Sequence, residues 1–291
     1  MLKRLVLTVI LCVWLLLLGC SPSSSPSQTV TPTASPSASP SAFSQASPSD
    51  APTLVPTAAP DPDGPLKALP LLSTVSADLN GDGTTEQMSF ATDENEVLTV
   101  SLQTASKDYS LKIEGCQYEA QYGYTVNGKT SVLLIYDMAS SDYVTSIISF
   151  NGTALVCTEI TGYVTKAENT SSGGILTFSQ PLDLFGTWLV SISHTLSDDF
   201  LVTKGNVYMF DSDSTVTTKT ELTAMDASGY PVTIPPGSTL TLVKTDGKAG
   251  VDFIYNQVVY TFEVKFDQDN NLFRVNGMLE TDAFVDLEYF G

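Results

Sequence analysis

Several residue types that common enzyme sites require are scarce in this 291-residue chain. It has one histidine, His194, four cysteines, and no Gly-x-Ser-x-Gly motif of the kind that presents a serine nucleophile. A zinc site built on two histidines is excluded, and any Ser-His-Asp or Cys-His site would have to use His194. His194 lies in a strand-like run, and we expect it to be an incidental residue at the surface or at a sheet edge. The sequence therefore favours a protein without nucleophilic catalysis.

Positive charge is also scarce. The chain has 13 Lys and Arg against 32 Asp and Glu, a formal net charge of −19. So negative a surface repels phosphate backbones and anionic lipid headgroups, which argues against nucleic acid as a partner. It favours cations, although solubility alone explains most of the acidic excess. Only Asp50, Asp61 and Asp63 precede the predicted folded part, so the acidity belongs to that part.

The chain begins with its one long apolar run. Lys3 and Arg4 precede an almost unbroken apolar segment from Leu5 to Leu18. At about 1.5 Å per residue a helix of this length covers roughly 21 Å, short of a hydrocarbon core of about 30 Å. Residues 1–19 are therefore predicted to be an export signal peptide.

The signal ends in Leu17-Leu18-Gly19-Cys20. Small Gly19 gives a peptidase access to the bond before Cys20, and the Cys20 thiol can accept a diacylglyceryl group. This segment resembles the bacterial lipobox. The resemblance implies that Cys20 becomes the lipidated first residue, with palmitate-type chains holding it at the extracellular face of the bacterial cytoplasmic membrane. The alternative is an ordinary signal peptide with a chance cysteine.

Residues 20–65 are predicted to be a disordered tether. From Ser21 onward the composition is almost entirely Ser, Pro, Ala and Thr, without Lys or Arg. Such a segment buries too little apolar surface to offset its ordering entropy, and its prolines favour extended polyproline II. At about 3.1 Å per residue, roughly 45 residues reach on the order of 140 Å, enough to extend into or through a cell wall.

Cysteine usage leaves one candidate disulfide. Cys12 leaves with the signal and Cys20 is assigned to lipidation, so Cys116 and Cys157 remain. Export permits a disulfide between them. Two buried free thiols fit equally well, because cysteine packs readily as a small hydrophobe. The sequence leaves both readings open.

The remaining residues, about 225 of them, are enough for one large or two small cores, and they read as successive strands. In Glu96–Gln103, Leu98, Val100 and Leu102 alternate with more polar residues, which is the period of a strand with one buried face. No long helical period occurs; only Leu279–Leu287 allows a short helix, which we do not expect. Further strands are predicted at Ser131–Tyr136, Tyr143–Phe150, Trp188–Ser193, Leu240–Lys244, Val251–Tyr255 and Val258–Phe266. Turns are predicted at Asn127-Gly128, Asn151-Gly152, Asp246-Gly247 and Asn276-Gly277.

The predicted fold is all-β: an antiparallel sheet or sandwich, or a partial propeller-like domain. Propeller blades of about 40–45 residues fit only about three times before residue 210, and a closed propeller needs at least four. We therefore expect a sheet or sandwich over residues 66–228. Residues 229–291, led by Ile234-Pro235-Pro236-Gly237, resemble a small SH3-like barrel. They could instead be the last strands of a single sheet.

The most informative motif is Asp78-Leu79-Asn80-Gly81-Asp82-Gly83-Thr84-Thr85-Glu86. Oxygen-bearing side chains stand at loop positions 1, 3, 5 and 9, and glycine stands at position 6. Ca²⁺ takes six to eight oxygen ligands, and glycine permits the sharp turn that wraps them around one ion. We assign Asp78, Asn80 and Asp82 as side-chain ligands, Thr84 as a carbonyl ligand and Glu86 as the closing carboxylate.

The type of loop follows from its last positions. An EF-hand or a dockerin needs an acid at position 12, where this chain has Ser89. An acid at position 9 followed by a strand instead resembles the integrin-α, FG-GAP and VCBS calcium loops. With the lipobox and tether, the whole chain resembles VCBS/FG-GAP-type lipoproteins of Gram-positive bacteria. That resemblance implies a calcium-stabilised surface domain and no known substrate; propellers of that kind carry several such loops, and this chain carries one.

The alternative to calcium is an Asx-rich turn without a metal, since Asp, Asn and Gly also suit turns. Three carboxylates within nine residues repel one another without a cation, so we favour structural calcium. Extracellular sites of this kind bind at roughly 10⁻⁴–10⁻³ M.

Two further sets of residues could form sites. Asp198-Asp199 and Asp211-Ser212-Asp213 could provide a carboxylate pair for glycoside hydrolysis, although acidic loops are far commoner. Aromatic residues could line a sugar-stacking surface, although in β domains they more often pack across strands. The aromatic set is Tyr118, Tyr122, Tyr124, Trp188 and Tyr208.

The sequence thus predicts a lipid-anchored, calcium-binding extracellular β protein. We expect a non-catalytic surface module that binds a wall polymer, glycan, peptide or protein. The alternative is an envelope-associated hydrolase that uses carboxylates on a glycan. A solute-binding lipoprotein is disfavoured, because the α/β alternation of two-lobed binding proteins is missing.

Overall fold

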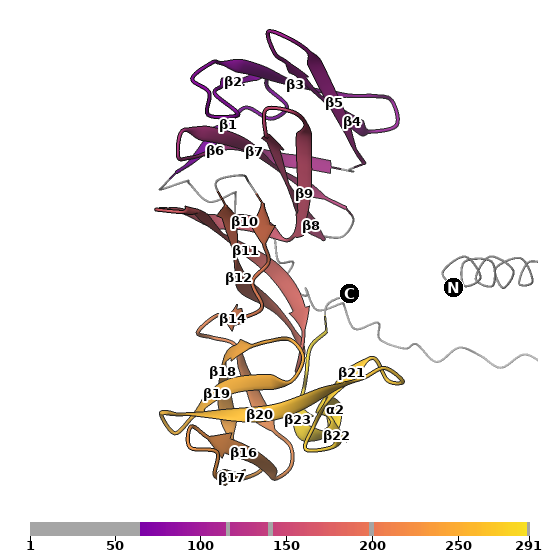
Figure 1. Ribbon diagram of the computed structural model, residues 1–291. Helices are drawn as coiled ribbons and strands as arrows, with labels where there is room; N and C mark the ends of the chain where they lie inside the picture. The colour runs from indigo at the N-terminus through magenta and orange to yellow at the C-terminus, as the bar shows by residue number, and fades with distance from the viewer. Residues whose placement is uncertain (1–64, 115–116, 139–141, 198–200, 290–291) are drawn as a thin grey trace, which may run out of the picture. The chain divides into compact units, whose positions relative to one another are not determined.

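The computed structural model describes residues 65–114, 117–138, 142–197 and 201–289 (Figure 1). These residues fall in one compact unit, residues 55–291. They form antiparallel β-sheets and one short helix, α2 (Glu280–Ala283), so the all-β prediction is confirmed. No helix in these ranges has the length and apolar character needed to span a membrane. The predicted signal peptide, Cys20, most of the tether, Cys116, Asp198 and Asp199 lie outside the described residues.

The first sheet has four strands in the order β2-β3-β4-β5. In β4 the side chains of Leu98, Val100 and Leu102 are buried while their neighbours are less so, as the alternation predicted. The bounds are β2 (Val75–Ala77), β3 (Glu86–Thr92), β4 (Val97–Gln103) and β5 (Asp108–Glu114).

The second sheet has five strands in the order β1-β6-β7-β8-β9 and is buried on both faces. In β7, Val132 and Leu134 pack in a core cluster with the first sheet, whereas Leu133 and Ile135 pack in a cluster with the third. A strand that packs on both faces needs apolar residues at consecutive positions, and β7 has them. The bounds are β1 (Leu66–Leu69), β6 (Gln117–Val126), β7 (Lys129–Asp137), β8 (Tyr143–Phe150) and β9 (Leu155–Thr161).

The third sheet begins with the long β10-β11-β12 meander, and β14, β18, β19, β20, β16 and β17 follow in its main order. β13 pairs with β12, β15 pairs with β18 and β23, and β21 pairs with β20 and β22. The bounds are β10 (Tyr163–Thr170), β11 (Gly173–Asp183), β12 (Thr187–Ser197), β13 (Val202–Thr203), β14 (Tyr208–Phe210), β15 (Thr215–Thr218), β16 (Leu222–Asp226), β17 (Pro231–Ile234), β18 (Thr239–Thr245), β19 (Gly250–Tyr255), β20 (Val258–Asp267), β21 (Leu272–Val275), β22 (Met278–Leu279) and β23 (Phe284–Val285).

The C-terminal strands continue this third sheet. Its core cluster runs from Leu184 to Phe284, and the described strands form no closed barrel. The SH3-like barrel is therefore not found, and the alternative of the last strands of one sheet describes the arrangement. The predicted boundary between residues 228 and 229 falls in the turn between β16 and β17, which pair with each other.

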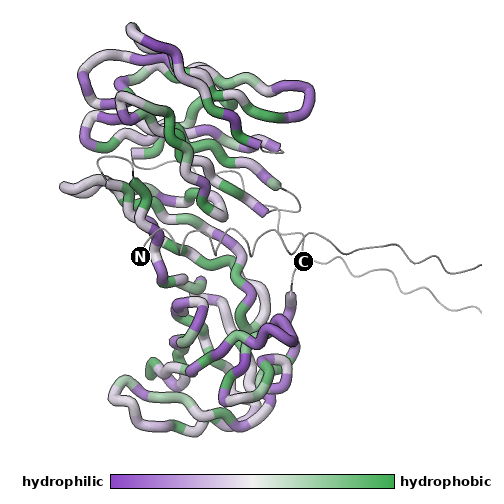
Figure 2. The backbone as a smooth tube through the Cα atoms, turned by 45° about the vertical axis from the view of Figure 1, so that its right-hand side comes forward, coloured by the Kyte–Doolittle hydropathy of each residue, from purple (hydrophilic) through white to green (hydrophobic). Residues whose placement is uncertain are grey.

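The four predicted turns all connect paired strands, but only Asn127-Gly128 and Asn276-Gly277 are two-residue hairpins; the turns at 151–154 and 246–249 have four residues, with positive φ at Gly152 and Gly247 and not at the preceding residue. Asn127 and Gly128 have φ angles of 50° and 81°, and Asn276 and Gly277 have φ angles of 51° and 80°. Two successive left-handed residues are what a two-residue hairpin requires, and Asn-Gly adopts them at low cost. Figure 2 shows hydrophobic residues alternating with hydrophilic ones along many strands, with mostly hydrophilic turns between them.

Candidate metal loop and ligand cavity

The predicted calcium loop connects β2 to β3 and is attached to the core at two points. Leu79 is fully buried in the cluster shared by the first and second sheets. The Thr130 N–H of β7 donates a hydrogen bond to the Asp78 carbonyl oxygen at 3.0 Å. The loop is therefore fixed against the second sheet rather than projecting freely from the hairpin.

Asp78 organises the first half of the loop through its side chain. Its two carboxylate oxygens accept the backbone N–H groups of Gly81 at 2.6 Å and Gly83 at 2.8 Å. Both glycines have positive φ angles, 81° and 84°, which lets their N–H groups turn inward toward one carboxylate. A Cβ on Gly81 would also lie 2.8 Å from the Lys129 Cγ, so the turn after β6 lies close against the loop.

Asn80 and Asp82 close the second half of the loop. The Asn80 Oδ1 accepts the Asp82 N–H at 2.8 Å, and the Asn80 Nδ2 donates to the Asp82 Oδ2 at 3.0 Å. The Asp82 Oδ1 accepts the Thr84 N–H at 2.7 Å. That backbone hydrogen bond, with the Asn80 and Thr84 side chains, holds the pKa of Asp82 below its ordinary value, so the carboxylate is ionised at neutral pH.

Glu86, the predicted closing ligand, is the most buried of the five residues at 4% exposure. Its Oε2 accepts the Leu79 N–H at 2.8 Å, so the side chain folds back onto the start of the loop. Within the described ranges no three His, Cys, Asp or Glu side chains gather closely enough to hold a metal. The five predicted ligands thus share one loop, but the carboxylates of Asp78, Asp82 and Glu86 do not converge in this conformation.

The donor chemistry of the loop nevertheless suits Ca²⁺. Every predicted ligand is an oxygen, which is the donor that Ca²⁺ prefers. Each carboxylate oxygen has two acceptor directions, so one that accepts a backbone N–H can still bind an ion. Asp78 and Asp82 both have their carboxylates fixed in this way. The loop thus orients these oxygen ligands through hydrogen bonds to its own backbone.

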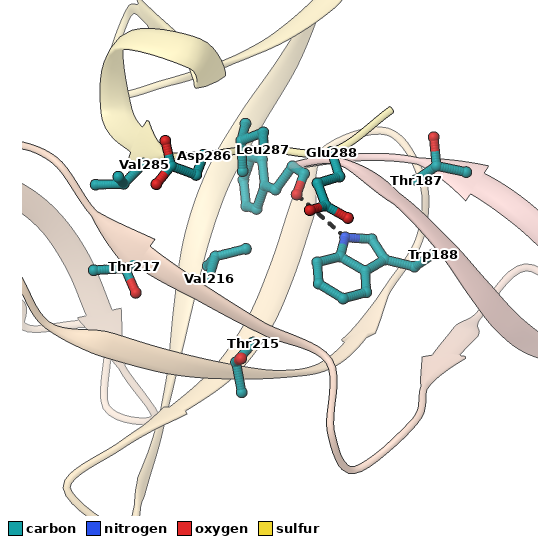
Figure 3. A pocket seen from close by; sticks show the side chains of 10 residues that line it. Thr187, Trp188, Thr215, Val216, Thr217, Val285, Asp286, Leu287 and Glu288 are labelled. Carbon is teal, nitrogen blue, oxygen red and sulfur yellow. Dashed lines mark hydrogen bonds between the residues drawn. The ribbon is translucent and has the colours of Figure 1, made fainter. Parts of the chain in front are cut away.

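A second feature, which the sequence did not reveal, is a cavity of about 370 Å³ in the C-terminal half (Figure 3). Its floor contains the buried side chains of Phe185 and Val216, and Trp188 forms one wall. Three segments line it: the turn before β12 with the start of that strand, the strand β15, and the end of β23 with the residues that follow it. The lining residues are Phe185, Thr187, Trp188, Thr215, Val216, Thr217, Val285, Asp286, Leu287 and Glu288.

The cavity arises where β23 separates from β15. The Lys219 N–H bonds to the Ala283 carbonyl, and Thr217 lies opposite Val285. Asp286 then has a φ of 48°, which turns the chain away from β15. Two residues later the Glu288 carbonyl accepts the Thr187 N–H at 2.8 Å. The C-terminal segment thus forms hydrogen bonds first with β15 and then with β12. A wedge-shaped space stays open between these two strands.

Trp188 is held rigidly at the side of this wedge. Its indole N–H is shared between the carbonyls of Leu184 at 3.1 Å and Phe185 at 3.2 Å. Its ring also lies edge-on to Phe210, with ring centroids 6.5 Å apart. Trp188 is thus a fixed aromatic wall, and part of its ring stays accessible because the residue is only half-buried.

The other aromatic residues behave as the packing interpretation predicted. Tyr122 and Tyr124 are buried in the cluster between the second and third sheets, and Tyr208 packs at its margin. Tyr118 contacts Tyr136 with ring centroids 5.7 Å apart. These aromatics therefore form no exposed stacking surface. Of the five aromatic residues singled out in the sequence, Trp188 alone lines the cavity described above.

The prediction for His194 is wrong. The side chain is 5% exposed, points into the core between the second and third sheets, and lies edge-on to Phe178. Its Nδ1 accepts the Gly205 N–H at 3.1 Å, and its buried Nε2 has no hydrogen-bond partner among the residues that the structure describes. Burial, followed by the charge of Lys204, lowers the pKa of His194. The period-two pattern of β12 placed His194 on the face of Ile192 and Leu196, and that was the signal for burial.

The remaining predicted groups are not brought together by described contacts. Asp211 and Asp213 are exposed in the turn before β15 and line no described cavity. Cys157 is half-buried in β9, and burial raises the pKa of its thiol. Because Cys116 lies outside the described residues, the Cys116–Cys157 disulfide stays a prediction.

No protein-family model, curated protein or solved structure matches this chain.

Proposed function

We propose that this protein is a lipid-anchored β domain of the bacterial cell surface, stabilised by Ca²⁺ in the Asp78–Glu86 loop, that acts as a non-catalytic binding module. The anchor is Cys20, the tether is residues 20–65, and the domain follows. The resemblance to VCBS/FG-GAP-type lipoproteins points the same way. The loop carries the proposal, because it places five oxygen-bearing residues within nine positions and fixes the carboxylates of Asp78 and Asp82 by hydrogen bonds to its own backbone.

Calcium in this loop would stabilise the fold by linkage. An ion that binds only the folded state adds RT ln(1 + [L]/Kd), about 1.4 kcal/mol when calcium is at ten times the Kd. The loop bonds to β7 through Asp78 and to the core through Leu79, so ordering the loop stabilises the contact between the first and second sheets. A millimolar Kd would suit the calcium concentration outside cells.

The test is thermal unfolding of the full chain in detergent, with 5 mM CaCl₂ or with EDTA. We expect a lower melting temperature in EDTA. Asp82→Asn, which keeps the acceptor for the Thr84 N–H but removes the charge, should abolish the difference. Asp246→Asn is the matched control: Asp246 Oδ1 also accepts several backbone N–H groups in a turn, but no calcium loop surrounds it. An identical melt of the wild-type protein in calcium and EDTA would refute the calcium site.

The anchor is tested separately by metabolic labelling with palmitate. The wild-type protein should incorporate label and partition into the membrane fraction, and Cys20→Ser should lose both properties. Absence of label from the wild-type protein would remove the lipid anchor from the proposal and leave the calcium result unaffected.

A further inference from the structure

We propose that the cavity beside Trp188 binds an extended peptide, which pairs with the free edge of β15 and inserts a lysine or arginine side chain. This inference rests on the proposed role as a binding module and assigns it a ligand class. The observations that carry it are an unpaired strand edge, an acidic rim and a rigid aromatic wall.

The free edge follows from the alternation of antiparallel hydrogen bonds. On one side of β15, the Leu242 N–H bonds to the Ser214 carbonyl and the Thr218 N–H bonds to the Ser238 carbonyl. The N–H and C=O of Thr215 and Thr217 therefore point to the other side. There Thr217 is opposite Val285, but the next rung, Thr215 with Leu287, is absent from the strand pairing.

Thr215 pairs with Thr241 of β18 on one side, and on the β23 side it presents one backbone donor and one backbone acceptor at the mouth of the wedge, where the described residues supply no strand partner. An extended peptide matches this pair, because one of its residues can donate to the Thr215 carbonyl and accept the Thr215 N–H. Its neighbouring side chain then points to the opposite face, toward Val216. Strand addition of this kind draws affinity from the main chain and specificity from the pocket.

The charge of the cavity selects a basic side chain. Asp286 and Glu288 are exposed lining residues, and no Lys, Arg or His is among the residues that line the cavity. Asp183 is hydrogen-bonded to Thr187, one of the lining residues. An anionic ligand would be repelled by these carboxylates, whereas an ammonium or guanidinium group would be attracted.

The apolar walls of the cavity suit the aliphatic part of a lysine or arginine side chain. Phe185 and Val216 form an apolar floor, and the indole of Trp188 faces the cavity in Figure 3. Lys and Arg have a long aliphatic stem with a charged end, so the stem can cover the apolar floor while the charge stays near the rim. A cation over a tryptophan face gains a further attraction. The hydrogen bonds that fix Trp188 avoid an ordering cost on binding.

The chain supplies its own reporter for the test. Trp14 and Trp188 are its only tryptophans, so the full chain with Trp14→Phe reports Trp188 fluorescence alone. The probe is the blocked pentapeptide acetyl-Thr-Thr-Lys-Thr-Thr-amide, titrated in detergent. We expect saturable fluorescence change. Norleucine in place of lysine should weaken binding roughly fivefold, as expected for a partly exposed charge pair. N-methylation of both threonines that flank the lysine should weaken it roughly tenfold or more, because the main-chain hydrogen bonds are lost.

The matched protein variants are Asp286→Asn and Asp282→Asn. Asn tolerates the positive φ of residue 286, so the first variant removes charge without straining the backbone. It should weaken the lysine peptide about as much as norleucine does. Asp282 is exposed on α2 and does not line the cavity, so Asp282→Asn should leave binding unchanged.

Three outcomes would overturn the proposal: no saturable change with the peptide, equal binding of the N-methylated analogue, or a response to glucose with none to the peptides. Failure here is separable from failure of the calcium site, since Asp82→Asn lies outside the cavity and should leave the peptide titration unchanged. Conversely, if the peptide does not bind as expected, the difference in melting temperature between calcium and EDTA should still be observed.

Discussion

The Asp78–Glu86 loop and the Trp188 cavity differ in how they are built. The loop uses nine consecutive residues, and most of its hydrogen bonds join residues two to seven positions apart. The cavity brings together residues 185–188, 215–217 and 285–288. The first feature can be recognised in the sequence as a spacing of oxygen-bearing side chains and glycines. The second exists only because β23 meets β15 and then turns toward β12.

This difference determines which substitutions the loop and the cavity should each tolerate. A local loop depends mainly on its own residues, so a change elsewhere in the fold should leave its calcium response intact. An assembled cavity depends on every contact that holds its three segments in place. The following predictions test this contrast, beginning with the largest expected effect.

The largest effect is expected at Glu280, which holds the cavity segments together. Its carboxylate is 1% exposed and accepts the Phe185 N–H at 2.5 Å and the Phe273 N–H at 2.7 Å. Glu280→Ala leaves two buried N–H groups without acceptors, at about 1–3 kcal/mol each, so we expect about 2–6 kcal/mol less free energy of unfolding. Urea unfolding followed by Trp188 fluorescence measures this.

The same variant checks that the two sites are independent. Glu280→Ala should still melt at a lower temperature in EDTA than in calcium. Glu280→Gln, which keeps one side-chain oxygen acceptor, should lose less stability than Glu280→Ala. A loss below about 1 kcal/mol in the alanine variant would mean that Glu280 does not hold the cavity segments together.

An intermediate effect is expected from the protonation of His194, which the fold buries against the sequence-based expectation. Burial and Lys204 lower its pKa, so the folded state binds this proton more weakly than the unfolded chain does. The free energy of unfolding should therefore fall as the pH drops through the unfolded value of about 6.5. Between pH 7.5 and 5.5 the loss is at most about 1.4 kcal/mol.

This pH effect is assigned by comparison with His194→Gln, because burial also raises the pKa of Glu280, which changes stability in the opposite direction as the pH falls. Urea unfolding of both proteins at both pH values gives the two differences. The wild-type protein, whose only histidine is His194, should lose more stability between pH 7.5 and 5.5 than His194→Gln does. Equal changes in the two proteins would contradict the buried, neutral state of His194.

The last effect, close in size to that of His194, is expected for Gly83→Ala in the loop. Gly83 has a φ of 84°, and a Cβ there would meet nothing within 4 Å. The cost is therefore backbone strain alone, about 1–2 kcal/mol at most, because only the left-handed conformation is penalised. Thermal unfolding in EDTA measures it. A much larger loss would show that the loop depends on packing with distant parts of the chain, which would break the contrast with the cavity.

Much of the fold could be predicted from short-range patterns. The alternation in 96–103, the apolar runs of β7 and β8, and the Asn-Gly turns at 127–128 and 276–277 all appear as expected. Each depends on backbone geometry that a few neighbouring residues determine. The short helix at 280–283 was not expected, because four residues show no helical period.

What the sequence by itself determined is therefore local: strands, turns, an all-β class, and a loop whose residues bond to one another. The tertiary structure decided what these strands pack against, as for His194 beside Phe178 and for the two faces of β7. It also decided that Thr215 lacks its next strand partner beside Trp188. The physical reason is the separation in sequence of the residues that interact. Hydrogen bonds within a turn join neighbouring residues, whereas burial and strand pairing bring together residues far apart in the chain.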